Sequence, residues 1–527
     1  MKMVHFVLPT LFAGVLVALG LGCKPSGPAA PTEVNAKFVS VSKNSFNEVT
    51  SQLDPGGSFY VYLSTAQWLS GLSTNVATWQ ASFDNLAPAM NTDRANIDNV
   101  FGIATRLIKD SGIEDASGVG MSSVEIEPGF YRNKSLLHHY PGQGQGFLWN
   151  LTGHSPHPLD GLNLLPANTA LAIFSDADVP LLWSVVSNGA AQSGFPVAQT
   201  ALQTFPTLFE QQTQIKWDQL LNSLGGEIGI LLTLNESNRL TLPIPTAAFE
   251  IPEPGLAVVL KVKDDTLFNR IDQELKKNPL AVSVDKPGLK MRTMPIPLPL
   301  PITLRPTAAS TGGYLLIGST DQLIDEMVAV QRGDKPGLKS TEEFKHLSRN
   351  LPDKGNQFSF VSERFSRAAR GIQSQAMTAA NARDKSAAQT QWLQNLLSQG
   401  QSMCSYSVEA NTENGCVVVA NGTQNGANAA LLPAVAVTGM LAAIAIPNFV
   451  KARATSQENA CLNNLRLIDA AKNQWALLNH KDGNAVPTEE DLKPFLKKWP
   501  TCPAGGTYTI GAVNEKPTCS IPDHRLP

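Results

Sequence analysis

Charged side chains are scarce in this 527-residue chain. Only 16% of its residues are Asp, Glu, Lys or Arg, against about 25% in an average soluble protein. The 41 basic and 44 acidic residues leave a net charge of −3, whereas a dedicated nucleic-acid-binding protein needs an excess of basic residues over phosphates. We therefore expect no nucleic-acid partner, and the 40 Gly and 36 Pro residues favour a loop-rich, partly β protein.

The sequence also lacks the short motifs of common hydrolases and nucleotide-binding proteins. No GxSxG, HExxH or CxxC occurs, and Pro141–Gly146 ("PGQGQG") lacks the Lys and the Ser or Thr of a phosphate-binding loop. The acidic pairs Asp264–Asp265 and Glu489–Glu490 stand at predicted helix starts, where they favour the positive end of the helix dipole. We expect a protein that is not an enzyme and that needs no cofactor.

Histidine is rare, yet half of the eight histidines lie in one short segment: His138, His139, His154 and His157. Imidazole is a good ligand for Zn or Cu, and the spacing of the last two could chelate a metal from a turn. However, the segment contains no Asp or Glu, and adjacent histidines in an extended chain point to opposite faces. The pattern favours solvent-exposed loop histidines, and a metal-dependent hydrolase is the least favoured function.

The first apolar run is too short for a comfortable membrane span. "VLPTLFAGVLVALGLG" follows the short basic start "MKMVHF" and ends before Cys23. This segment resembles a bacterial lipoprotein signal peptide, which implies that Cys23 receives a lipid and anchors the protein facing the periplasm. Gly20 stands where such signals prefer Leu, so ordinary cleavage after export and a retained anchor are the alternatives. Residues 24–37 are rich in Pro and Ala and predict an extended tether.

Export favours disulfides among the cysteines that remain after the lipidated one. Cys404 and Cys416 flank a hairpin-like stretch, which predicts a disulfide across the hairpin. Cys502 and Cys519 flank a Gly-rich, β-like stretch and form the second predicted pair. Cys461 is left over, and we expect it to be buried on a helix.

Three segments of the chain look alike, at residues 53–63, 165–174 and 351–361. Each opens with Leu and a Pro-containing turn, and then alternates apolar and polar residues as a half-buried strand does. Further strand-to-helix patterns cover residues 255–275 and 312–330. The sequence predicts an α+β fold of repeated strand–helix units on largely antiparallel sheets.

The order of these motifs over residues 160–370 resembles a family of bacterial envelope proteins of unknown function. That resemblance implies an extracytoplasmic α+β domain and transfers no catalytic residue. Two segments, 242–255 and 295–306, alternate Pro with apolar residues. Because Pro removes ladder hydrogen bonds, they favour edge strands or covering loops over a groove for an apolar ligand or peptide.

Near the C-terminus, the uncharged segment 429–446 approaches the minimum length of a membrane-spanning helix. A helix with one buried face follows, because apolar residues recur every three or four positions at Cys461, Leu465, Ile468, Ala471, Trp475 and Leu478. The motifs "LAAIAIPNF", "NNLRLIDAAKNQWAL" and "CPAGGTYTIGAVNEKPTCS" resemble type IV pilins and the major pseudopilins of type II secretion systems. The resemblance covers residues 431–523 and implies a long helix packed on a small β-sheet.

The departures from the pilin pattern argue against a filament subunit. The Gly–Phe cleavage site of prepilins would fall at Asn425–Gly426 and their conserved Glu at Ala430, so both are missing. A span at 429–446 would send the last domain to the cytoplasm, in line with the basic residues that follow, whereas a Cys502–Cys519 disulfide needs an oxidising compartment. We favour a helix that does not span the membrane.

The sequence therefore predicts a non-catalytic cell-envelope lipoprotein whose pseudopilin-like domain serves as a scaffold or docking unit for envelope or secretion-system proteins. The alternative is an exported binding protein for an apolar ligand or peptide. The expected parts are a lipoprotein-type signal peptide (1–23), a tether (24–37), an N-terminal α+β unit (38–160), an α+β domain (161–425), an apolar helix (426–446) and a pseudopilin-like domain (447–527).

Overall fold

The computed structural model of the protein describes residues 44–84, 94–244, 247–296, 304–381, 403–426, 460–496, 498–503, 505–521 and 524–526. The predicted signal peptide with Cys23, the tether and the apolar segment 429–446 lie outside these residues. Within the described part of the chain, no helix is both long and apolar enough to cross a membrane. The predicted α+β fold class is confirmed, because helices alternate with antiparallel strands throughout.

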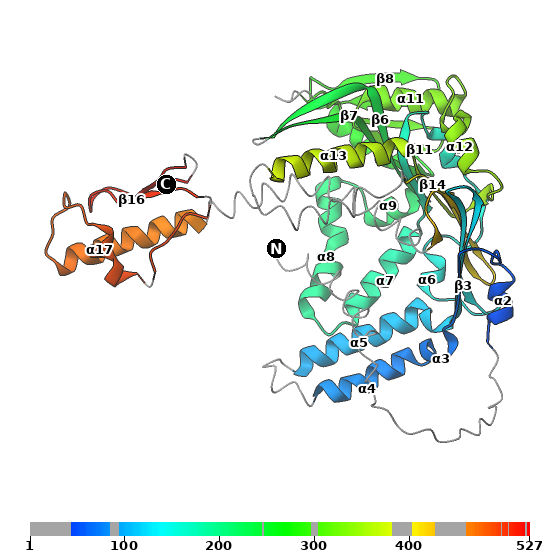
Figure 1. Cartoon of the computed structure of the whole chain (residues 1–527), viewed down its shortest axis with the longest axis horizontal. Coiled ribbons are helices and arrows are strands. Elements are labelled where there is room, and N and C mark those ends of the chain that lie inside the picture. The colour runs from blue at the N-terminus through cyan, green and yellow to red at the C-terminus, as the bar shows by residue number, and fades with distance from the viewer. Residues whose placement is uncertain are drawn as a thin grey trace. The chain divides into compact units, whose positions relative to one another are not determined.

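One large sheet organises the described residues up to 426 (Figure 1). It has 13 strands in the order β1-β2-β3-β15-β14-β13-β5-β6-β7-β11-β10-β9-β8, and each neighbouring pair is antiparallel. The strands are β1 (Phe59–Ser64), β2 (Ala116–Glu127), β3 (Phe130–His139), β5 (Thr169–Asp176), β6 (Leu224–Ile244), β7 (Ala247–Val262), β8 (Val282–Lys286), β9 (Leu289–Thr293), β10 (Thr307–Thr311), β11 (Tyr314–Gly318), β13 (Gln357–Val361), β14 (Ser405–Thr412) and β15 (Gly415–Gly422). A two-stranded ribbon joins β4 (His157–Pro158) to β12 (Lys354–Gly355).

The sheet contains three copies of one strand–helix–hairpin unit. In each copy a first strand is followed by helices and then by two hairpin strands: β1 with β2–β3, β5 with β6–β7, and β13 with β14–β15. The first strand pairs with the second and the second with the third. The three look-alike sequence segments lead into β1, β5 and β13, so they correspond to the starts of the three units.

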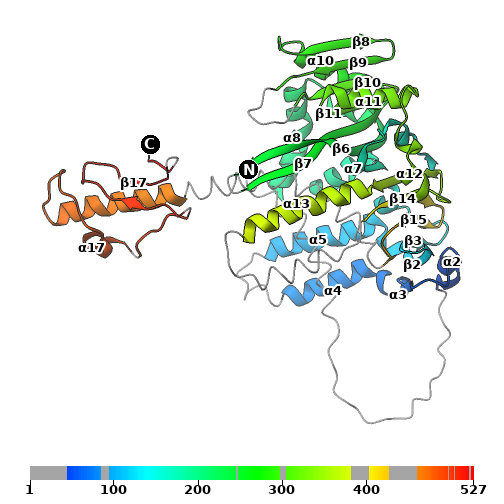
Figure 2. The same cartoon turned by 45° about the horizontal axis from the view of Figure 1, so that its top comes forward.

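Helices connect the strands and cover the sheet. They are α2 (Phe46–Thr50), α3 (Ala66–Leu69), α4 (Leu72–Asp84), α5 (Arg94–Ser111), α6 (Phe147–Asn150), α7 (Val179–Ala191), α8 (Pro196–Thr213), α9 (Trp217–Ser223), α10 (Thr266–Leu275), α11 (Asp321–Arg332), α12 (Glu342–Leu347) and α13 (Glu363–Asn381). Short 3-10 turns are η3 (Ile113–Asp115), η4 (Asp160–Leu164) and η5 (Leu338–Ser340). Helices α4 and α5 run side by side, and α13 lies along β7 (Figure 2).

The main core lies on one face of the sheet, under α11 and α12. Alternate residues of each strand point to this face, and Phe174 of β5 stacks on Phe358 of β13 with ring centroids 4.9 Å apart. Met327 of α11 and Phe344 of α12 are buried in the same cluster. Each such side chain stabilises the fold by roughly 1.5–3 kcal/mol when it leaves water. This face ends in polar residues where β5, β6 and β7 meet, at Asp176, Glu227 and Lys261.

Of the Pro-rich segment 242–255, the described residues 242–244 and 247–255 lie in the β6–β7 hairpin, beyond the residues that pair with β5 and β11. Strands β6 and β7 are interior strands of the sheet, so the predicted edge-strand character applies only to this extension. Its exposed edge is covered by a side chain of α13. Gln375 donates from Nε2 to the carbonyl of Glu250 at 3.0 Å and accepts from the Glu250 N–H at 2.8 Å. The amide thereby replaces a ladder partner and protects the edge from pairing with another chain. Part of the second Pro-rich segment, residues 297–303, lies outside the described residues.

The C-terminal unit, residues 460–526, contains a helix over 460–478, the short helix α17 (Glu489–Leu492) with the turn η6 (Lys493–Phe495), and a ribbon of β16 (Tyr508–Thr509) and β17 (Thr518–Cys519). The predicted buried face is confirmed at five of its positions, whereas Leu478 is 71% exposed because the helix ends there. Lys472 is fully buried, and its ammonium donates to the carbonyls of Ala512, at 2.8 Å, and Glu515. This lysine ties the helix to the loop before β17.

Candidate functional site

A cleft of about 560 Å³ opens at the point where the core face of β5, β6 and β7 ends. This volume falls in the range of pockets that hold small molecules, about 300–1,000 Å³. The lining is unusually rich in ionisable groups: His157, Asp176, Asp178, Glu227, Lys261 and Lys263. Acidic and basic side chains both line the cleft, which extends to the start of α7.

Two carboxylates stand side by side in this cleft, because Asp176 of β5 and Glu227 of β6 are register partners. Residues directly opposite each other on neighbouring strands project to the same face. The register between β6 and β7 shifts between Leu224 and Ile228, so Glu227 lies within a bulge, and Gly226 adopts a φ of +89° there. Such a φ suits glycine, and bulges re-aim the side chains that follow them. The local sequence "GGE" thus directs Glu227 into the cleft.

The carboxylate of Glu227 is buried, but its hydrogen-bonding capacity is not satisfied by the described residues. Its side chain is only 7% exposed, and Lys261 Nζ lies 3.7 Å from Oε2. Neither carboxylate oxygen has a hydrogen-bond partner among the described residues. Burial raises the pKa of Glu227 above its usual value, and the positive charges of Lys261 and His157 offset only part of that effect. Glu227 therefore offers two acceptor atoms that the described protein groups leave unused.

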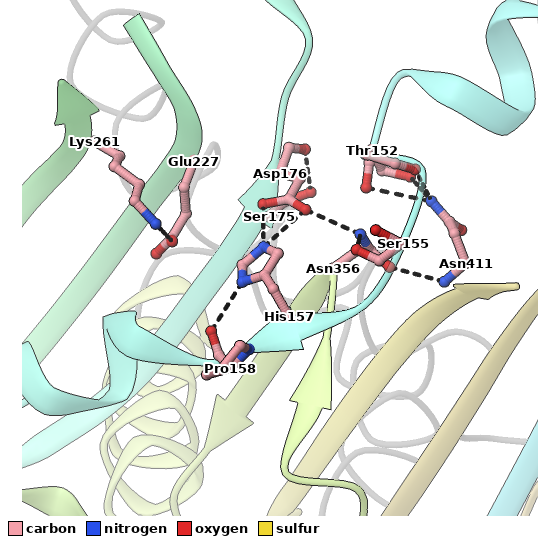
Figure 3. A network of polar contacts seen from close by, with 11 residues as sticks. Thr152, Ser155, His157, Pro158, Ser175, Asp176, Glu227, Lys261, Asn356 and Asn411 are labelled. Atoms are coloured by element: carbon pink, nitrogen blue, oxygen red, sulfur yellow. Dashed lines mark hydrogen bonds and ion pairs between the residues drawn. The ribbon is translucent and has the colours of Figure 1, made fainter. Parts of the chain in front are cut away.

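His157 is held in a fixed orientation by both of its ring nitrogens (Figure 3). Nε2 lies 2.9 and 3.0 Å from the two oxygens of Asp176, and Nδ1 lies 2.8 Å from the carbonyl of Pro158. Only the protonated ring donates from both nitrogens. Burial lowers the pKa of His157, but the hydrogen bonds to Asp176 and Pro158 raise it more, so the pKa lies above its usual value. The ring acts as a cation paired with Asp176.

Two buried asparagines fasten the loop that carries His157 to the sheet (Figure 3). Asn356 donates from Nδ2 to Asp176 at 3.0 Å and to the carbonyl of Ser155 at 2.9 Å, and its Oδ1 accepts from the N–H of Asn411. Asn411 in turn donates to the carbonyl of Gly153 at 2.6 Å. Gly153 has a φ of +86°, and an added Cβ would lie 2.6 Å from an oxygen of Asp176. The loop, the ribbon β4–β12 and the cleft therefore form one polar network.

The four histidines singled out in the sequence do not come together as one site. His138 and His139 end β3 and are buried, with Ser117 Oγ 2.7 Å from His138 Nδ1 and the His139 ring edge-on to Trp149. Burial lowers the pKa of His138. The prediction of solvent-exposed loop histidines is wrong for this pair, because the strand continues through them. His154 and His157 line the cleft instead.

The hairpin predicted between Cys404 and Cys416 is present as β14–β15, but no disulfide crosses it. Cys416 lies opposite Asn411, whereas the N–H of Cys404 bonds to Thr423 at the other end of the ladder. The register therefore places the two cysteines at opposite ends of the hairpin. Burial raises the pKa of both thiols, to about 11 for Cys404.

The second predicted disulfide, Cys502–Cys519, is not formed either, although the two residues are neighbours. Their sulfur atoms lie 3.8 Å apart, whereas a disulfide bond is about 2.05 Å long. Cys461 is buried on helix 460–478 as predicted, and it packs in the same cluster as these two cysteines.

Comparisons of the chain with protein-family models, with curated proteins and with solved structures find no match. The lipoprotein and pilin resemblances therefore stay predictions, and the site has to be interpreted from its own chemistry. Sequence reasoning missed Asp176, Glu227 and Lys261. Acidic residues at the end of an apolar strand ("FSDAD") and directly after a glycine pair ("GGE") are the patterns that could have revealed the first two.

Proposed function

We propose that the protein is a non-catalytic cell-envelope lipoprotein whose sheet domain binds a small polar ligand in the cleft beside Glu227. The main observation that supports this proposal is the buried Glu227 carboxylate, which has no hydrogen-bond partner among the described residues. A buried polar group without a partner costs about 1–3 kcal/mol, and a charged group costs more. A ligand with a hydroxyl or ammonium donor would recover this cost on binding.

The rest of the cleft narrows the ligand chemistry. Lys261 and Lys263 bring hydrogen-bond donors to the cleft, and Asp176 and Asp178 bring acceptors. This arrangement suits a small molecule that carries both donors and acceptors, such as a polyol or a zwitterion. It favours a polar ligand over the apolar ligand or peptide that the Pro-rich segments suggested.

The lining also favours binding over nucleophilic catalysis. The described residues that form the cleft include no Ser, Thr, Cys or Tyr side chain. A general base needs a free lone pair, so His157 is excluded from that role, because its two nitrogens are engaged by Asp176 and by the Pro158 carbonyl.

Native mass spectrometry of the full-length protein from its own envelope fraction tests this proposal. We expect an adduct of roughly a few hundred daltons, the size that such a cleft accepts, and we expect Glu227→Gln to remove it. Glu250→Gln is the matched control, because Glu250 is a largely exposed carboxylate outside the cleft. An unmodified wild-type mass, or an adduct that survives Glu227→Gln, would contradict ligand binding at this site.

The membrane anchor is supported by the sequence alone and is tested separately. Cys23→Ser removes the residue that the signal resemblance assigns to lipidation. We expect the variant to move from the membrane fraction to the soluble periplasmic fraction, without a change in the cleft adduct. Membrane retention equal to wild type would contradict a lipid anchor at Cys23.

Docking through the C-terminal unit is a second candidate function, favoured by exposed apolar side chains. Leu477 and Leu478 at the end of helix 460–478 are 79% and 71% exposed, and Val486 in the next loop is 65% exposed. Apolar groups gathered on a surface often mark a protein partner. We expect Leu477→Ser with Leu478→Ser to dissociate an envelope complex that Leu467→Ser leaves intact. Wild-type secretion and pilus function after gene deletion would count against a link to those systems.

A further inference from the structure

Four buried side chains with metal-binding atoms converge inside the C-terminal unit. They are Cys461 on helix 460–478, Cys502 in the loop after η6, Cys519 on β17 and His524 in the C-terminal tail. Their sulfur and ring-nitrogen atoms all lie within 4.8 Å of one another. Each side chain comes from a different segment, so the local sequence does not account for the convergence.

Two spacings within the cluster match the edges of a tetrahedron around zinc. Bonds of about 2.3 Å to sulfur and about 2.0–2.1 Å to nitrogen, at tetrahedral angles, place two sulfurs about 3.8 Å apart and a sulfur about 3.5 Å from a nitrogen. The Sγ atoms of Cys502 and Cys519 are 3.8 Å apart. Cys502 Sγ and His524 Nδ1 are 3.5 Å apart. Three cysteines and one histidine are also a known ligand set of structural zinc sites.

A disulfide explains the cluster less well than a metal ion does. A Cys502–Cys519 bond would use two of the four groups and leave Cys461 and His524 buried beside it, both under 7% exposed.

The residues around the cluster hydrogen-bond to its ligand atoms and pack closely against them, as residues around a metal site do. Tyr508 Oη lies 3.4 Å from Cys461 Sγ and is oriented by a 3.1 Å hydrogen bond from Asn464. Such outer contacts orient metal ligands. Gly506 passes so close that an added Cβ would lie 2.6 Å from Cys519 Sγ. Leu465 closes the inner side of the cluster.

The unit also has little else to hold these four segments together. The buried members of this end of its core are Cys461, Leu465, Cys502 and Cys519, so three of the four are cysteines. Domains below about 70–80 residues commonly need disulfides or a structural metal in addition to their apolar core. A bound ion would join the helix, the loop, the strand and the tail at one point.

We propose that the C-terminal unit binds one Zn²⁺ ion through Cys461, Cys502, Cys519 and His524. The three cysteines bind as thiolates after releasing their protons, and His524 binds through Nδ1 as a neutral imidazole. Four protein ligands close the coordination sphere, so the site is structural and leaves no position for a substrate. The proposal is independent of the ligand cleft in the sheet domain.

Zinc content of the full-length protein, after dialysis against metal-free buffer, tests the site. We expect one zinc per chain in the wild type and at least a tenfold loss in Cys461→Ser and in His524→Gln. Cys404→Ser and His480→Gln are the matched controls, because they remove the same residue types outside the cluster, and their zinc content should equal wild type. Equal zinc content in all variants would overturn the site.

Two further measurements keep the test decisive where a variant misfolds. Cobalt added to metal-free wild type should give the intense visible bands of tetrahedral Co²⁺ and thiolate-to-cobalt charge-transfer bands. Peptide mapping without reductant, on protein from its own envelope, should find Cys502 and Cys519 unlinked. A Cys502–Cys519 disulfide peptide, or cobalt spectra of an octahedral ion without thiolate bands, would overturn the proposal.

Discussion

The cleft of the sheet domain and the cysteine cluster of the C-terminal unit both gather polar side chains, but they satisfy them differently. In the cleft, groups of opposite kind meet, as His157 meets Asp176 and Lys261 meets Glu227. In the cluster, three thiols and one imidazole face one another, and the cluster itself contains no carboxylate or ammonium group. The first arrangement is paired by charge but leaves the Glu227 oxygens without a hydrogen-bond partner among the described residues, whereas the second calls for a cation at its centre.

This contrast separates a reversible binding site from a structural one. The cleft is open and lies where the core face of β5, β6 and β7 ends. The large sheet has its own core, so the fold does not depend on an occupant of the cleft. The cluster is closed and supplies most of the buried side chains at its end of the C-terminal core. Loss of the occupant should therefore leave the fold of the sheet domain intact but destabilise the fold of the C-terminal unit.

Metal removal should have the largest effect and should separate the two regions most clearly. A strong zinc chelator is expected to destabilise residues 460–526 by about 4 kcal/mol or more, the stabilisation that a ligand gives at about 1,000 times its Kd. Hydrogen exchange should show lost protection in helix 460–478 and unchanged protection in β5, β6 and β7. Cys461→Ser is the control, because the chelator should add nothing to it. Equal loss of protection in both regions would contradict the contrast.

Asn356→Ala should be the most damaging change on the cleft side. Asn356 is 3% exposed and serves Asp176, Ser155 and Asn411 at once. Its removal leaves buried groups without partners, which costs roughly 2–3 kcal/mol. Urea unfolding should show this loss for the sheet domain, while Asn238→Ala, an exposed control, should stay within about 0.5 kcal/mol of wild type. If the urea midpoint of Asn356→Ala equals that of the wild type, the network does not hold the loop.

Glu227→Gln should stabilise the fold while it weakens ligand binding. Since the folded-state pKa of Glu227 is raised, the folded protein loses stability as the pH rises through that pKa and the buried group ionises. At about pH 8 the variant, which cannot ionise, should be more stable by roughly 1 kcal/mol or more. The difference should vanish at about pH 4, below the usual pKa of a glutamate. A variant that is less stable at the higher pH would show that the Lys261 pairing outweighs burial.

Loss of the His157–Asp176 pair should have the smallest effect on stability. Here, in contrast to Glu227→Gln, the wild type should be the more stable protein. Because the folded-state pKa of His157 is raised, its stabilisation is fully present below the unfolded pKa of about 6.5 and is lost as the pH rises through the folded pKa. The ring is 34% exposed, so solvent screening keeps the contribution below about 1 kcal/mol. Wild type should exceed His157→Gln in stability at about pH 6, and the gap should close with rising pH. A gap that widens instead would exclude the pairing.

The repeated strands could be predicted from the sequence because their pattern is local. The Leu–Pro openings at residues 53, 165 and 351 precede β1, β5 and β13, and the period-two alternation that follows shows in any single segment. The spacing of buried residues on helix 460–478 was equally accessible. These features depend on residues only a few positions apart.

The sites could not be predicted because they depend on register and on distant segments. Asp176 and Glu227 are about 50 positions apart, and only the strand pairing places them opposite each other. The same limit applies to the cysteines. The sequence shows that Cys404 and Cys416 flank a hairpin but not which residues they face, and it left Cys461 unpaired, although the fold brings it to Cys502 and Cys519.

X-ray absorption at the zinc edge, on the full-length protein isolated without added metal, is the most direct test of the difference between the two regions. We predict a first shell of three sulfur atoms at about 2.3 Å and one nitrogen at about 2.0–2.1 Å. Among the described residues, three cysteines and a histidine come together only at the C-terminal cluster, and the cleft lining includes no cysteine. A shell of nitrogen and oxygen alone, or a protein without zinc, would contradict a structural metal site in the C-terminal unit.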